Sequence, residues 1–256
     1  MTAPSPAPAG PVPPARRRHV LRYTIIGVVV VALIVGLTAL LTSGFRCALG
    51  ESYVDQGDCP QCFKGCLAPG MSAKPIIYLY PAQPTAVDVT VSHPELFTAQ
   101  YPAYGDGWAV MAQPDGTLTD RRTGRELYAL YYESQRLVPG RRTAEGFVVP
   151  GSGTAAFLER TLPQLGLSPR ETEEFIVYWL PQLQANPYTY IRFETLAEQA
   201  ANQALTITPD PDTLIRVMMD WQRLEKPVPV TPQTLVAPVR TGFVVVEWGG
   251  TQIPGR

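Results

Sequence analysis

Histidine is scarce in this chain of 256 residues, which contains only two. His19 lies beside an arginine cluster near the amino terminus, and His93 lies in a turn-like segment, Ser-His-Pro-Glu. A hydrolase that pairs a serine or cysteine nucleophile with a histidine base would have to use one of them, and the G-x-S-x-G turn that presents such a serine is missing. The sequence therefore argues against histidine-dependent hydrolysis and against a histidine-rich metal site.

Nucleotide-binding motifs and an excess of positive charge are also lacking. The chain has no P-loop and no G-x-G-x-x-G turn between a strand and a helix. Its formal net charge is -1, and residues 74–256 contain 15 basic against 19 acidic side chains. Because polyanions bind through neutralisation of phosphates by Lys and Arg, we expect no nucleic-acid partner. No motif in the sequence predicts a cofactor.

A single long apolar run is present, over residues 23–45 between Arg22 and Arg46. At a rise of about 1.5 Å per residue, a helix of this length crosses the hydrocarbon core of a bilayer, which is about 30 Å thick. A cleaved signal peptide normally has a shorter apolar stretch of about 7 to 15 residues, and a buried core helix is less uniformly apolar. We expect residues 23–45 to form one uncleaved transmembrane helix with the lipid bilayer as its partner.

The cations that flank this run predict its orientation. Arg16, Arg17, Arg18 and Arg22 precede it, whereas fewer cations follow it closely. Since Lys and Arg near a helix end are retained on the cytoplasmic side, the Pro-rich tail of residues 1–22 should be cytoplasmic. The sequence thus predicts a single-pass protein of the cell membrane whose carboxyl-terminal part is extracytoplasmic.

All four cysteines lie in a neck over residues 46–73: Cys47, Cys59, Cys62 and Cys66. Outside the cytoplasm, oxidising conditions favour two disulfides, and the spacing leaves three pairings open. Two alternatives remain: a zinc site formed by the four thiolates, and a redox pair formed by Cys59 and Cys62.

Residues 74–256 have the pattern of one α+β domain that consists mainly of antiparallel strands. Helices are indicated by the apolar stripe from Phe157 to Leu165 and by capping signals at Ser168 and Thr195, of which Ser168 should begin only a short helix. A meander is expected over residues 97–133. Short runs rich in β-branched and aromatic residues predict strands over residues 74–81, 86–92, 97–101, 107–113, 126–133, 174–181, 189–194, 204–209, 214–221 and 242–250.

Four blocks of this domain prompt a resemblance: KPIIYLYP, YGDGW, EFIVYWLPQLQANPY and the closing GFVVVEWGG. Together, and in this order, they are similar to an uncharacterised family of bacterial proteins. The resemblance covers residues 74–250 and implies that this stretch is one domain. It implies no activity, cofactor or catalytic residue.

Carboxylates beside aromatic residues are the most suggestive chemical feature. Glu133 follows two tyrosines, Glu174 precedes Phe175, and Glu247 lies between Val246 and Trp248. Aromatic walls can raise the pKa of a carboxylic acid, and two such groups can flank a glycosidic bond. The structural interpretation of the same pattern is that strand residues alternate, so that each Glu points to solvent while its neighbours enter the core.

Two functions follow from these features. The first is an extracytoplasmic module that binds an envelope protein or a glycan. The second is a glycan hydrolase that uses two of the three Glu carboxylates, and it requires those carboxylates to share a cleft with a separation of about 5 to 9.5 Å.

Overall fold

The computed structural model describes residues 52–55, 64–67, 71–138 and 140–253. The expected membrane helix at residues 23–45, the tail and three of the cysteines lie outside these ranges, and only the backbone of Cys66 is described. Within the described ranges, no helix is long and apolar enough to cross a membrane. Two neck strands, β1 (Ser52–Asp55) and β2 (Lys64–Leu67), pair with each other in an antiparallel hairpin.

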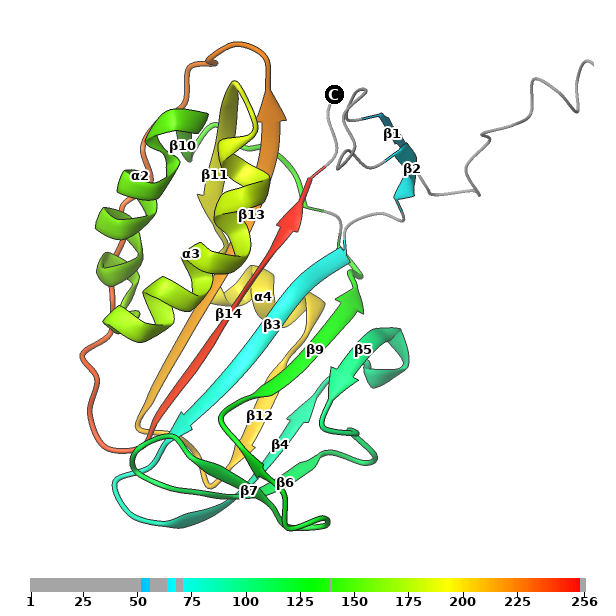
Figure 1. Cartoon of the computed structure of the whole chain (residues 1–256), viewed down its shortest axis with the longest axis vertical. Helices are drawn as coiled ribbons and strands as arrows, with labels where there is room; N and C mark the ends of the chain where they lie inside the picture. The colour runs from blue at the N-terminus through cyan, green and yellow to red at the C-terminus, as the bar shows by residue number, and fades with distance from the viewer. Residues whose placement is uncertain (1–51, 56–63, 68–70, 139, 254–256) are drawn as a thin grey trace, which may run out of the picture. The chain divides into compact units, whose positions relative to one another are not determined.

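A seven-stranded mixed sheet is the centre of the domain (Figure 1). Its neighbouring strands are antiparallel, except for β13 and β14, which run parallel. The last strand in the sequence pairs with β3, the first strand of the domain, so both ends of the domain meet in the middle of the sheet. The spatial order is β10 (Phe147–Pro150), β11 (Tyr188–Phe193), β13 (Thr213–Leu224), β14 (Val244–Gln252), β3 (Met71–Tyr80), β9 (Leu130–Gln135) and β5 (Phe97–Tyr101).

A helical layer covers one face of this sheet. It comprises α2 (Thr154–Thr161), which follows the short 3-10 turn η2 (Gly151–Gly153), then η3 (Leu162–Leu165) and α3 (Pro169–Gln184). In α3, Phe175, Trp179 and Leu183 recur every four residues and are buried against the sheet. Their partners on β13 are the alternating residues Ile215, Val217, Met219 and Trp221, which share one face of the strand.

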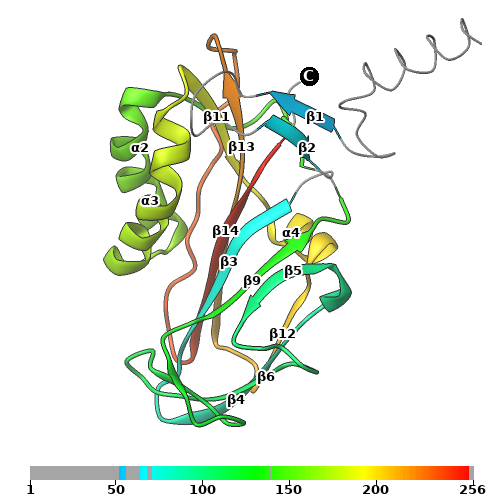
Figure 2. The same cartoon turned by 45° about the vertical axis from the view of Figure 1, so that its right-hand side comes forward.

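A five-stranded sheet covers part of the opposite face, as the rotated view shows (Figure 2). Valines on alternate positions of β4 pack there against residues of β3, β9 and β14, which makes a second hydrophobic core. A 3-10 turn, η1 (Pro94–Leu96), leads from this sheet into β5. The spatial order of the sheet is β12 (Leu205–Thr208), β4 (Thr85–Val91), β6 (Trp108–Ala112), β7 (Leu118–Asp120) and β8 (Glu126–Leu127).

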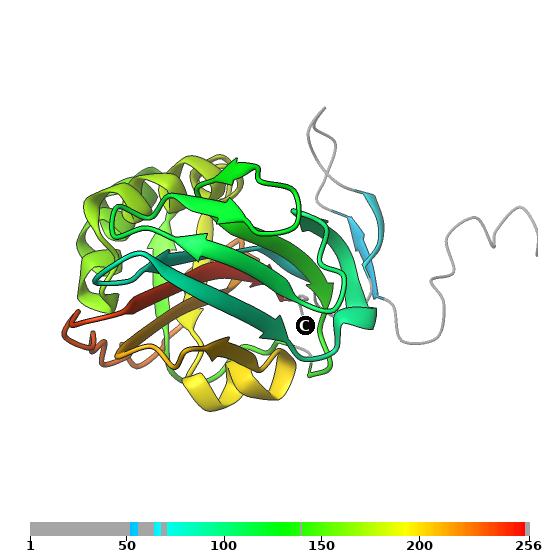
Figure 3. The same cartoon turned by 90° about the horizontal axis from the view of Figure 1, so that it is seen from below.

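The helix α4 (Leu196–Asn202) lies on the other side of the seven-stranded sheet from α2 and α3 (Figure 3). It begins with a complete capping box, in which Thr195 accepts from the amide of Glu198 while the Glu198 carboxylate accepts from the amide of Thr195. The predicted α+β class with mainly antiparallel pairing is thus confirmed, and the domain has two hydrophobic cores, one on each face of the seven-stranded sheet.

Two expectations about local structure are wrong. Residues 174–181 were expected to form a strand, yet they lie inside α3. The Ser168 capping box and the four-residue spacing of the buried aromatics stabilise one helix of 16 residues, and tertiary burial overrides the strand preference of Ile176, Val177 and Tyr178. The expected meander over 97–133 is also divided, because β5 and β9 belong to the seven-stranded sheet while β6, β7 and β8 belong to the other.

Candidate functional site

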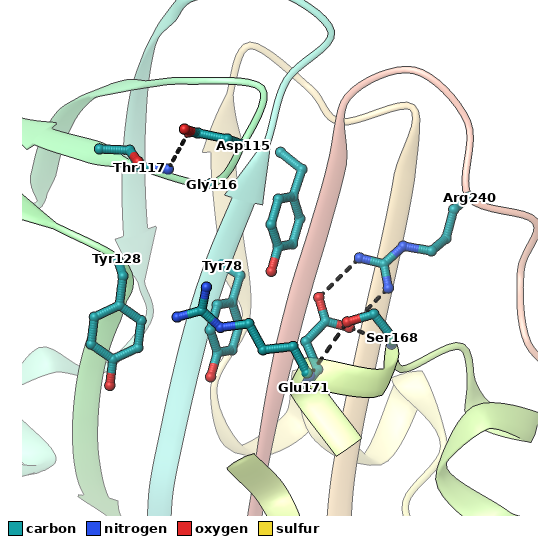
Figure 4. A pocket seen from close by; sticks show the side chains of 10 residues that line it. Tyr78, Asp115, Gly116, Thr117, Tyr128, Ser168, Glu171 and Arg240 are labelled. Atoms are coloured by element: carbon teal, nitrogen blue, oxygen red, sulfur yellow. Dashed lines mark hydrogen bonds and ion pairs between the residues drawn. The ribbon is translucent and has the colours of Figure 1, made fainter. Parts of the chain in front are cut away.

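A pocket of about 250 Å³ opens where the end of β3, the turn between β6 and β7 and the first turn of α3 meet (Figure 4). We call it the tyrosine pocket, because three tyrosine side chains form much of its wall. Its lining residues are Tyr78, Tyr80, Asp115, Gly116, Thr117, Tyr128, Ser168, Arg170, Glu171 and Arg240.

Strand alternation explains how two of the tyrosines come together. Tyr78 and Tyr80 are two residues apart on β3, so both point to the helical side, and their rings are parallel with centroids 6.3 Å apart. Tyr128 adds a third ring, 6.4 Å from Tyr78 and tilted by 47°. The Tyr128 side chain is 56% exposed and packs only loosely. The pocket therefore offers two fixed aromatic rings and one accessible ring.

A glycine allows the turn between β6 and β7 to approach this wall. Gly116 has φ of +90°, and a Cβ atom placed on it would lie 2.6 Å from a ring carbon of Tyr80. A larger residue there would meet both backbone strain and the ring. Asp115, beside it, accepts a hydrogen bond of 2.9 Å from the amide of Thr117, which fixes the turn. The narrowness of the pocket thus depends on Gly116.

A bidentate ion pair forms the opposite wall. Arg240 donates from both terminal nitrogens to the carboxylate oxygens of Glu171, at 2.8 and 2.9 Å, and its guanidinium carbon lies 5.5 Å from the ring centroid of Tyr80. Glu171 also accepts from the amide of Ser168 at 2.7 Å. Burial alone would raise the pKa of Glu171, but Arg240 and the Ser168 amide lower it below its ordinary value. Glu171 is therefore a fixed carboxylate in the capping box of α3.

A second charged pair lies at the edge of the pocket. The Arg170 Nε donates to Glu174 at 3.0 Å, and the guanidinium carbon lies 5.9 Å from the ring centroid of Tyr128. Tyr78 donates its hydroxyl proton to the same Glu174 carboxylate. Burial, followed by this hydrogen bond, raises the pKa of Tyr78 far above its ordinary value, so the phenol stays neutral.

Both arginines of the tyrosine pocket are paired with carboxylates. Arg240 pairs with Glu171, and Arg170 pairs with Glu174 at the edge of the pocket. Aromatic rings, fixed hydrogen-bonding groups and the absence of an unpaired arginine among the lining residues suit an uncharged polar ligand with apolar C–H faces.

The helical face of the sheet continues from the pocket along α3. Lys74 has φ of +53° at an irregularity in the pairing of β3 with β9, a conformation that costs a residue with a side chain about 1–3 kcal/mol. Its ammonium group lies 4.5 Å from the ring centroid of Tyr178 and 5.6 Å from that of Trp248. Burial and then the carboxylate of Glu133 raise the pKa of Tyr178, so Glu133 lies on this face as well.

Glu247 is placed differently from both expectations. It is fully buried, on the face of β14 that packs towards the five-stranded sheet. Its carboxylate accepts from Arg216 Nε and, at 2.8 Å, from the hydroxyl of Tyr132. The prediction that Glu247 faces solvent is wrong because β14 is a central strand covered on both faces. Alternate side chains of β14 therefore point into one or the other of the two hydrophobic cores.

The three candidate carboxylates consequently divide between two faces. Glu174 binds the hydroxyl of Tyr78 on the helical side, where Glu133 also lies, whereas Glu247 is on the opposite side of the sheet. Glu247 cannot share a cleft with either of the others. Within the described ranges, no group of three or more His, Cys, Asp or Glu side chains is arranged to hold a metal ion.

Several residues of the tyrosine pocket have no sequence motif that marks them as functional. Alternation in KPIIYLYP could have placed Tyr78 and Tyr80 on one face, and that signal was available. Tyr128, Arg170 and Arg240 lie far from β3 in the sequence and reach it only through tertiary packing. Comparison with known proteins finds no family model, no curated protein and no solved structure that matches this chain.

Proposed function

We propose that this chain is a single-pass membrane protein whose extracytoplasmic domain binds a neutral sugar unit of an envelope glycan in the tyrosine pocket. The observation that carries the proposal is the combination of three tyrosines with two arginines that are already neutralised by carboxylates. Sugars present C–H faces that pack on aromatic rings and hydroxyls that bond to fixed polar groups. The arginine asymmetry around residues 23–45 supports the extracytoplasmic placement.

Binding can be tested with the full chain in detergent micelles and soluble neutral oligosaccharides, measured by calorimetry. Tyr128→Ala should weaken binding by about tenfold or more, because an aromatic contact contributes about 0.5–1.5 kcal/mol beyond its buried area. Tyr101→Ala is the matched control, since Tyr101 is 48% exposed and is not among the lining residues. Equal affinity of the two variants would refute the assignment of the pocket.

Membrane placement needs its own experiment. A tag after Arg256 should be digested when protease is added to cells whose outer layers have been opened, while a tag at the amino terminus should stay protected. Protection of the carboxyl-terminal tag would contradict the orientation, whatever the binding assay shows.

Glycan hydrolysis is a second candidate, limited by the geometry to Glu133 and Glu174, which lie on the same face. If the domain cleaves the glycan, Glu174→Gln and Glu133→Gln should each abolish product formation while binding persists. Slow turnover that survives both substitutions would exclude this pair as the catalytic carboxylates.

A further inference from the structure

A second pocket, of about 320 Å³, lies on the face of the seven-stranded sheet opposite to α2 and α3. We call it the arginine pocket, because Arg136, Arg141 and Arg192 line it. Arg192 on β11 and Asp220 on β13 alternate with residues that pack under the helical layer, so both point away from the tyrosine pocket. Glu198 of α4 also lines the pocket.

Buried charges form the floor of this pocket. The Arg136 Nη1 lies 3.4 Å from Asp220 Oδ1 and 3.1 Å from the hydroxyl of Thr251, and it also contacts Glu194. The Arg192 Nη1 lies 3.3 Å from Asp220 Oδ2, and Asp220 is 1% exposed. Removing charged groups from water costs free energy that their pairing only offsets, so this cluster is not an efficient way to stabilise the domain.

The pairing of the arginines is incomplete. Arg192 is 6% exposed, and its Nε has no hydrogen-bond acceptor in the part of the chain that the structure describes. Its Nη2 donates to Glu198 at 2.6 Å. Arg141, at the exposed rim, has no ion-pair partner among the described residues. The pocket is thus lined by a buried arginine with one unused N–H and by an exposed arginine without an ion-pair partner among the described residues, and both favour an anionic ligand.

The charges of the residues that line the arginine pocket indicate the charge of that ligand. Three arginines face Glu194, Glu198 and Asp220. Burial, followed by the charge of Glu194, raises the pKa of Asp220 to about 8, so near neutral pH this carboxyl holds its proton. The pocket then has one positive charge in excess, which matches a monoanion. A dianion such as sulfate would leave surplus negative charge beside Glu194 and Glu198.

We propose that the arginine pocket binds a small organic carboxylate, which accepts hydrogen bonds from Arg141 and Arg192. This site lies beyond the proposed glycan function and does not depend on it. The carboxylate would supply the acceptor that these two arginines lack. The body of the ligand would fill the space between α4 and the loop at Gly140, whose lack of a side chain allows close approach to Asp220.

The probe is lactate, titrated into the full chain in detergent micelles with binding measured by calorimetry, beside the uncharged lactamide and inorganic sulfate. Saturable binding of lactate, no binding of lactamide and at least about tenfold weaker binding of sulfate would support the proposal. If lactate does not saturate, if lactamide binds equally well, or if sulfate binds as tightly as lactate, the assignment is overturned.

Two arginine variants locate the site. Arg141→Ala should weaken lactate binding by at least about tenfold, since a hydrogen bond to a charged group is lost. Arg160→Ala, on the exposed side of α2, removes the same charge on the other face of the sheet and should leave binding unchanged. If both variants weaken binding equally, the attraction is a property of overall charge and the pocket is not the site.

A titration with pH tests the involvement of Asp220. Lactate affinity should fall as pH rises through about 8, because ionised Asp220 removes the excess positive charge. The groups that face this carboxyl are Arg136, Arg192 and Glu194, and Arg136 also contacts Thr251. Asp220→Asn keeps the side chain neutral and should abolish the fall, whereas an unchanged pH profile would contradict the role of Asp220.

Discussion

At the residue scale, the domain concentrates charge in its interior. Arg216 and Glu247 form an ion pair on neighbouring strands, and the guanidinium also donates to the carbonyl of Gln203 at 3.0 Å. Neither residue could be identified as buried from the sequence, because Glu247 sits among apolar neighbours in a strand that a one-sided sheet would expose. Their burial depends on the five-stranded sheet that covers this face of β14, and the alternation of residues along one strand does not predict that second layer.

This pair gives a stability prediction. Arg216→Met should lower the free energy of unfolding by about 3–5 kcal/mol, because it leaves the Glu247 carboxylate buried without its cation. Adding Glu247→Leu should restore much of that loss, because the double variant buries no net charge. Denaturant unfolding of the single and double variants measures both effects, and a double variant less stable than Arg216→Met would show that the pair is not the cause.

At the element scale, signals at helix ends proved more reliable than composition. Ser168 and Thr195 were expected to cap helices, and both form complete capping boxes, while Gly166 ends η3 with φ of +94°. Residues 174–181 are rich in β-branched and aromatic side chains, which wrongly indicated a strand. The segment is helical because the helix places Phe175, Trp179 and Leu183 on one buried face. Signals at helix ends depend on backbone hydrogen bonds within one turn. The secondary structure of a segment rich in β-branched and aromatic residues depends instead on which elements pack against it.

The turn between β6 and β7 offers a prediction with an internal control. Gly116→Ala should destabilise the domain more than Gly124→Ala does, by roughly 1 kcal/mol or more, and should weaken binding in the tyrosine pocket. Both glycines have positive φ, but a Cβ on Gly124 meets no atom within 4 Å, whereas one on Gly116 meets Tyr80. Thermal unfolding of the two variants separates the ring contact from backbone strain, and equal losses would show that the contact has no effect.

At the scale of the whole molecule, sequence patterns predicted the strands but not their assignment to sheets. Nine of the ten expected strand segments contain observed strand residues, yet the order β10-β11-β13-β14-β3-β9-β5 joins strands from both ends of the domain. That order depends on long-range packing of two cores, and single-strand periodicity contains no information about it. The tyrosine pocket could not be predicted from sequence patterns for the same reason, because its residues come from segments that are far apart in the sequence.

The pH dependence of stability is a property of the whole molecule that follows from two opposing shifts. The pKa of Asp220 is raised by burial, so its stabilising contribution is present below its unfolded pKa of about 4 and is lost as pH rises towards about 8. The pKa of Glu171 is lowered by Arg240 despite burial, so its contribution is lost as pH falls below about 4. On the basis of these two groups, we expect the free energy of unfolding to be greatest at mildly acidic pH and to fall towards alkaline pH.

Asp220→Asn tests the alkaline side of this profile. Between about pH 6 and pH 9, the free energy of unfolding of the unsubstituted chain should fall, and that of the variant should fall less. Chemical denaturation at several pH values measures the difference. Parallel profiles would mean that another group titrates in this range.

The central position of β14 has a consequence for biosynthesis. Without Val244–Gln252, the sheet divides into two groups of strands that share no backbone ladder: β10, β11 and β13 on one side, and β3, β9 and β5 on the other. The strand that joins them follows every other strand in the sequence, so the nascent chain cannot complete its fold early. The proposed extracytoplasmic placement would make use of this order, because a domain that closes last can cross the bilayer before its central strand is in place.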